Sequence, residues 1–109
     1  MKFLVIIEGV PGQPTRPPAE TLAHIKEVWA WSRRMKESGK ADVTYSLVDH
    51  AGGLMGGMGI MNVASLEELA ENLGTCPATG IAIFKVYPLV SQEVVEKLIE
   101  GALASLSKK

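Results

Sequence analysis

Residues 42–63, with the sequence DVTYSLVDHAGGLMGGMGIMNV, constrain the fold most because they are typical of two strands joined by a tight turn. The first run has a period of two, which is the pattern of a half-buried strand, and Gly52 and Gly53 supply the turn. The second run is rich in glycine and methionine, so its order must come from the elements packed on it rather than from β-propensity. The stretch therefore predicts a central hairpin that the rest of the chain covers.

The rest of the chain supplies elements that flank this hairpin. Residues 2–9 form a nearly continuous β-branched run, which predicts a central strand. A proline-rich loop over residues 10–18 leads into a helix that begins near Pro17 or Pro18 and ends at Gly39. The second predicted helix covers 65–74; it begins with the capping box SLEE, and its buried face carries Leu66, Leu69, Ala70 and Leu73. A strand over 80–87, closed by Pro88, and a last helix over 91–106 complete the chain.

The order β-α-β-β-α-β with an added helix predicts an α+β, ferredoxin-like fold. Right-handed crossovers then place the four strands in an antiparallel sheet in the order 4-1-3-2, with helices on one face. The length of 109 residues suits a single domain, 1–109, in which 91–106 is an added C-terminal helix.

Side-chain alternation assigns the two faces of this sheet. Residues expected to meet the helices include Phe3, Val5, Ile7, Tyr45, Leu47, Met61, Val63, Ala82, Phe84 and Val86. The opposite face would be largely apolar, and a patch of that size favours a partner, most simply a second copy of the chain. A second apolar stripe on the first helix, His24, Val28, Trp31 and Met35 beside Leu22, Ile25, Trp29 and Ser32, favours the same homo-oligomer. Alternatively, the last helix folds over its own sheet.

Composition excludes several classes of partner. Eleven basic and 12 acidic residues give a net charge of −1 without a basic stripe, which argues against nucleic acid. The opening apolar run is too short for a signal peptide, and no stretch reaches the ~18 apolar residues of a membrane span. The single cysteine, Cys76, lacks the companions of a zinc site. We expect a cytoplasmic protein with no metal and no cofactor.

Candidate catalytic residues gather at one predicted end of the sheet. The first two strands should run parallel, so Glu8 would lie near Asp49 and His50, and the first helix would bring Glu20 and His24 to the same rim. A proton-transfer enzyme needs a base and a donor, and we take Glu8, His50 and His24 as catalytic candidates and Asp49 as a binding candidate. Turn hydrogen bonds, capping and ion pairing are the structural alternatives.

Further binding candidates lie elsewhere on the sheet. Lys85 and Tyr87 are expected at the opposite end, where Lys85 could bind a carboxylate or simply form an ion pair. Met58 is expected on the open face and is a third binding candidate. Cys76 precedes a proline and has no adjacent base, so it is rejected as a nucleophile.

Several segments resemble a known family. These are MKFLVIIEGVP, PPAETLAHIKEVWAWSRRMKESGK, NVASLEELAENL and KVYPLV. Over roughly the first 90 residues the chain resembles muconolactone δ-isomerase and its relatives, in the dimeric α/β-barrel group. The resemblance implies a ferredoxin-like oligomer with a small pocket for a lactone or another small organic acid, and carries no catalytic residue over to this sequence.

The leading hypothesis is a small homo-oligomeric, cofactor-free isomerase that moves a proton in a small lactone or organic acid. One alternative is a non-catalytic module that binds a small ligand or a partner. Another is a cofactor-free monooxygenase-like enzyme, which would need a substrate that reacts directly with oxygen.

Overall fold

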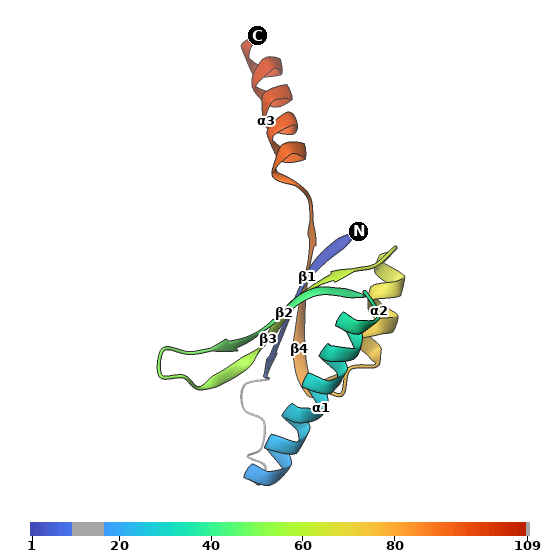
Figure 1. The fold of residues 1–109 in the computed structure, drawn as a ribbon. Helices are drawn as coiled ribbons and strands as arrows, with labels where there is room; N and C mark the ends of the chain where they lie inside the picture. The colour runs from blue at the N-terminus through green and yellow to red at the C-terminus, as the bar shows by residue number, and fades with distance from the viewer. Residues whose placement is uncertain (10–16, 109) are drawn as a thin grey trace.

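A computed structural model describes residues 1–9 and 17–108 and shows one four-stranded sheet with three helices (Figure 1). Most of the predicted loop over 10–18 lies outside the described residues. In chain order the elements are β1 (Lys2–Gly9), α1 (Pro18–Glu37), β2 (Ala41–Val48), β3 (Leu54–Asn62), α2 (Leu66–Gly74), β4 (Ala82–Leu89) and α3 (Gln92–Ser107).

The predicted topology is confirmed. The strands lie in the order β2-β3-β1-β4, which is the predicted order viewed from the other edge, and all neighbouring pairs are antiparallel. Since β1 and β2 both pair antiparallel with β3, they run parallel to each other, as expected. Helices α1 and α2 lie on the same face of the sheet in Figure 1, whereas α3 continues away from the end of β4.

The core lies between the sheet and these two helices. Its main cluster consists of Phe3, Val5, Ala41, Met61, Val63 and Leu69, and an adjoining cluster consists of Trp31, Cys76 and Ala78. Trp31 satisfies its indole N–H by donating to the Thr75 hydroxyl over 2.8 Å, which ties α1 to the C-terminal end of α2. Val28 and Met35 pack against the core. The second stripe of α1 therefore faces its own chain, and it does not support self-association as the sequence suggested.

The face assignment of β2 is wrong, because this strand contains a bulge. The register with β3 shifts between Ala41 and Val43, so one extra residue changes the side of every residue after it. Thr44 and Ser46 consequently face α1, whereas Tyr45 and Leu47, predicted to meet the helices, lie on the open face of the sheet.

The helix ends follow the local sequence. Helix α1 begins at Pro18 and ends in a Schellman motif: Gly39, at φ +77°, donates its N–H to Lys36 O, and Lys40 donates its N–H to Met35 O. Ser65 caps α2 by accepting the Glu68 N–H at 3.1 Å, as predicted. The Glu68 carboxylate returns to the Ala64 N–H, one residue before the partner that a standard capping box would use.

Other local expectations need correction. β4 continues through Pro88, because β4 is an edge strand in which a missing N–H can face solvent. On α2, Leu69 is buried and Leu73 packs on the core, but Leu66 and Ala70 are exposed because α2 contacts the sheet along a narrower stripe than predicted.

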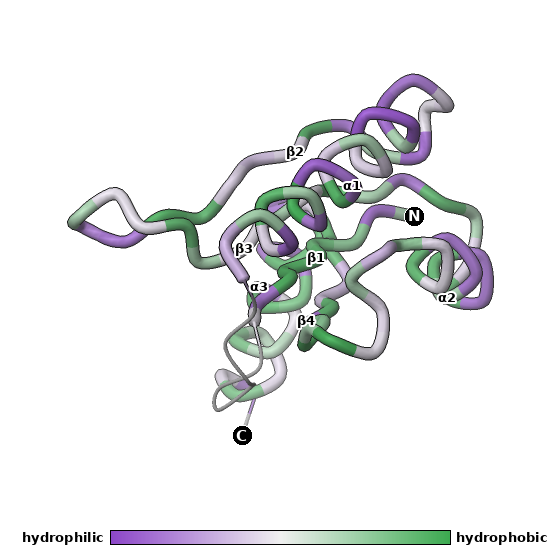
Figure 2. Tube along the Cα trace, turned by 90° about the horizontal axis from the view of Figure 1, so that it is seen from below, coloured by the Kyte–Doolittle hydropathy of each residue, from purple (hydrophilic) through white to green (hydrophobic). Residues whose placement is uncertain are grey.

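Helix α3 leaves its apolar stripe uncovered within the single chain. None of its residues is buried, and Leu98, Leu103 and Leu106 are each more than 60% exposed. Figure 2 shows both hydrophobic and hydrophilic residues along this helix, and Figure 1 shows the helix extending away from the sheet. The structure does not show α3 folding over its own sheet, which was the alternative to a partner.

Candidate functional site

A cavity of about 420 Å³ lies between α1 and the sheet, above β2 and β3. It exists because Gly57 and Gly59 occupy the helix-facing positions of β3, paired with Ile7 and Val5 of β1. These glycines leave the space beneath α1 unfilled, since neither contributes a side chain to the floor.

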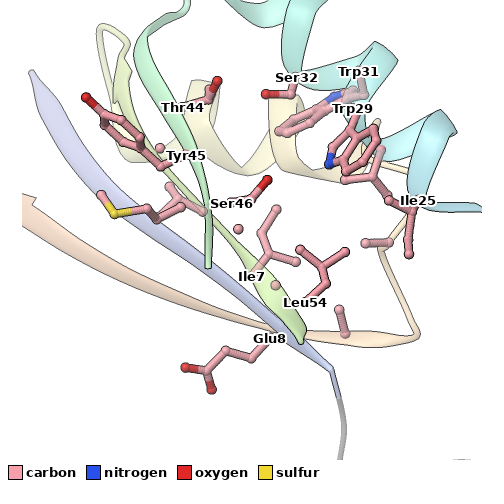
Figure 3. Close-up of a pocket in the computed structure, with 18 of the residues that line it drawn as sticks. Ile7, Glu8, Ile25, Trp29, Trp31, Ser32, Thr44, Tyr45, Ser46 and Leu54 are labelled. Carbon is pink, nitrogen blue, oxygen red and sulfur yellow. The ribbon is translucent and has the colours of Figure 1, made fainter. Parts of the chain in front are cut away.

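The cavity combines an apolar wall with a few hydroxyl groups. Ile25, Val28 and Trp29 of α1 face Ile7 and Leu54 of the sheet. Hydroxyl groups come from opposite walls: Ser32 from α1, and Thr44 and Ser46 from β2. In Figure 3 Ser46 and Ile7 point toward Trp29, while Tyr45 lies on the other side of β2. Such an apolar site with a few placed polar groups is typical of small-molecule binding sites.

His24 is the predicted catalytic candidate whose position in the structure fits best. It lies in the N-terminal half of α1, half-buried, and lines the cavity together with Thr21. Glu20 is exposed in the first turn of α1 and does not line the cavity.

Glu8 also borders the cavity, but its carboxylate has another partner. Its side chain points away from Ile7 and Leu54 in Figure 3 and forms an ion pair with Lys85 over 3.1 Å. Lys85 of β4 lies opposite Ile6 of β1, and its side chain reaches diagonally to Glu8, two residues further along β1. The expectation that Lys85 and Glu8 lie at opposite ends of the sheet is therefore wrong, because the antiparallel register brings them together on the open face.

Asp49 and His50 lie in the β2–β3 turn and are not among the residues that line the cavity. The Asp49 carboxylate accepts the N–H groups of Ala51 and Gly53, at 2.9 and 2.8 Å, and so organises the turn. His50 is exposed. The five polar residues expected at one rim therefore do not converge: Glu8 and His24 border the cavity, and the other three do not.

Of the remaining candidates, Met58 is among the residues that line the cavity and Tyr87 is not. Met58 is half-buried in β3 opposite Ile6, and Tyr87 is 49% exposed and pairs with Leu4 on the open face. Cys76 is buried, and its burial raises the pKa of the thiol, which agrees with its rejection as a nucleophile.

Sequence reasoning missed the hydroxyl residues as site residues. Ser32 was visible only as the polar member of an apolar helical stripe. Thr44 and Ser46 were assigned to the wrong face, and only recognition of the bulge near Asp42 would have corrected this. Within residues 1–9 and 17–108, no three His, Cys, Asp or Glu side chains gather closely enough to hold a metal ion. None of the helices in this part of the chain combines the length and hydropathy needed to cross a bilayer.

Comparison with solved structures defines the class of fold. The chain is similar to muconolactone isomerase, with a TM-score of 0.68, 18% identity, and coverage of 84% of this chain and 91% of that chain. It is also similar to 5-chloro-2-hydroxyhydroquinone dehydrochlorinase from Burkholderia phenoliruptrix AC1100, determined in complex with 2,5-dihydroxybenzoquinone, with a TM-score of 0.67, 19% identity, and coverage of 85% and 97%. At these identities the likeness concerns the fold alone: it confirms the ferredoxin-like class, and the fold is that of muconolactone isomerase, as the resemblance implied.

The family model for the YCII-related domain matches residues 1–93, so the chain belongs to the YCII-related domain family. This match ends at the start of α3. A comparison with curated protein sequences gives no significant match.

Proposed function

We propose that this protein is a small cofactor-free enzyme that binds an oxygenated ring compound between α1 and the sheet and moves a proton within it. The observation that carries the proposal is the cavity itself, in which the His24 imidazole and several hydroxyl groups border a mainly apolar space. The two structural neighbours support it, since the names of both describe enzymes acting on small organic compounds.

The roles follow from the chemistry of each group. Histidine exchanges protons near neutral pH, and His24 removes a proton from the ring carbon next to a carbonyl. The electron pair moves into the carbonyl and forms an enolate, whose oxygen accepts hydrogen bonds from Ser32, Thr44 or Ser46. His24 then returns the proton at a more distant carbon, so the double bond moves and no atom is gained or lost.

The two histidines of the chain provide a matched test. An unsaturated five-membered lactone, α-angelica lactone, is incubated with the protein in D₂O, and proton NMR follows deuterium uptake and double-bond migration. The wild type is expected to accelerate both, His24→Gln to lose the acceleration, and His50→Gln to keep it, because His50 lies in the exposed turn. Equal activity in wild type and His24→Gln would refute the role of His24. Binding without any proton exchange would favour a non-catalytic binding protein.

We further propose that the functional form is a homo-oligomer. Two apolar surfaces of the chain have no cover within the described residues: the stripe of α3, and the open face of the sheet, where Tyr45 is 64% and Ile83 is 40% exposed. A second copy offers the complement of both, and two-fold symmetry would cover them together.

Sedimentation velocity on the full chain at micromolar concentration tests the oligomer. At least a dimer is expected, and Leu98→Glu and Tyr45→Glu are expected to shift it toward monomer. Glu100→Gln, a change within α3 that adds no charge to the stripe, serves as the control. A monomeric wild type would refute the proposal.

A further inference from the structure

A second recess, of about 250 Å³, adjoins the cavity at the exposed edge of the sheet. Its walls are shared with the cavity, and the shared residues are Trp29, Ser32, Thr44 and Ser46. The two residues that belong to the recess alone are Arg33 and Lys36. The apolar cavity is thus bordered on one side by two cations.

The positions of these cations follow from helix geometry. Residues 29, 32, 33 and 36 are spaced as i, i+3, i+4 and i+7, so they form one stripe on α1. This stripe lies along β2, which is an edge strand, so Arg33 and Lys36 stand where the recess opens to solvent.

Neither cation forms an ion pair within the described part of the chain. The ion pairs there are Lys2–Asp42, Lys40–Glu68 and Lys85–Glu8, none of which involves Arg33 or Lys36. The recess lies along the C-terminal half of α1, whose dipole places roughly half a negative charge at the helix end. Two full positive charges outweigh it, so the recess favours an anion.

We propose that this recess is a carboxylate subsite of the ligand cavity. A ligand would place its ring against Trp29 in the cavity and its carboxylate between Arg33 and Lys36, where the guanidinium can donate two parallel hydrogen bonds. The inference rests on the proposed function and narrows its ligand to monoanionic ring compounds that carry one carboxylate, such as lactone acids or hydroxylated aromatic acids.

The test compares two probes that differ in one charge. 2,5-Dihydroxybenzoate and its neutral methyl ester are titrated into ¹⁵N-labelled full-length protein, and the Trp29 indole resonance reports the occupied cavity. The wild type should bind the carboxylate about tenfold more tightly than the ester, as expected for one charge-assisted contact. Arg33→Gln should remove most of this preference and Lys36→Gln part of it, with ester binding nearly unchanged.

Arg34→Gln is the matched control. The substitution removes one positive charge from the same helix, and Arg34 lines neither the cavity nor the recess. It should keep the preference for the carboxylate. If the wild type binds both probes equally, or if Arg34→Gln loses as much preference as Arg33→Gln, the subsite is refuted while the cavity stands. If neither probe binds, the proposed function fails, and the subsite with it.

Discussion

Gly57→Val should fill the floor of the cavity. It should weaken ligand binding and at the same time stabilise the fold. A Cβ at Gly57 would lie 3.4 Å from the Tyr45 carbonyl oxygen, an ordinary van der Waals contact, and the backbone there is not left-handed. The new side chain would project into the space beneath α1.

The expected stability change is favourable. Replacing a glycine in the interior of a strand contributes about 0.5–1 kcal/mol. Partial burial of the valine in a half-open cavity contributes about 1 kcal/mol more, less than the ~1.5–3 kcal/mol of full burial. Gly57→Val should therefore raise the free energy of unfolding by about 1.5–2 kcal/mol, while probe binding weakens at least tenfold because the ring loses its space.

Gly56→Ala is the control at the next position. A Cβ at Gly56, where φ is +158°, would stand 2.0 Å from the Ile7 carbonyl oxygen, so the sheet would have to move apart. A loss of about 3 kcal/mol or more is expected. Urea unfolding measures both variants, and NMR titration measures binding. Unchanged binding by a folded Gly57→Val protein would show that ligands do not occupy this cavity.

Three further predictions concern local chemistry. Ser65→Ala should lower the free energy of unfolding by about 0.5–2 kcal/mol in urea denaturation, because the Glu68 N–H loses its acceptor; an unchanged value would show that the cap is dispensable. The hydrogen bond from Lys40, followed by that from the Ala64 N–H, lowers the pKa of Glu68 below its usual 4.5, so its contribution to stability is present above that pH and is lost as the pH falls through the lowered pKa. Thermal melts should show Glu68→Gln less stable than wild type at pH 7 and the two converging in acid; a constant difference would contradict this. Burial raises the pKa of the Cys76 thiol, so Ellman's reagent at pH 8 should react with it only on unfolding, and rapid native-state labelling would disprove its burial.

The sequence by itself determined the elements and their order. The spacing of hydrophobic residues, the cap of α2 at Ser65 and the glycine end of α1 at Gly39 are local signals, because each reflects hydrogen bonding or packing within a few residues. Handedness and short connections then permitted few strand orders, and the predicted one is present.

The site depended on tertiary structure. One bulged residue near Asp42 decided that Thr44 and Ser46, rather than Tyr45, face α1, and a one-residue shift of this kind leaves no clear trace in the pattern of β2. The register between β1 and β4 brought Lys85 to Glu8, and so occupied a carboxylate that the sequence left available for catalysis. The cavity itself depends on Gly57 and Gly59 lying beneath α1. The size of the space they leave is set by the distance between α1 and β3, which are separate in the chain.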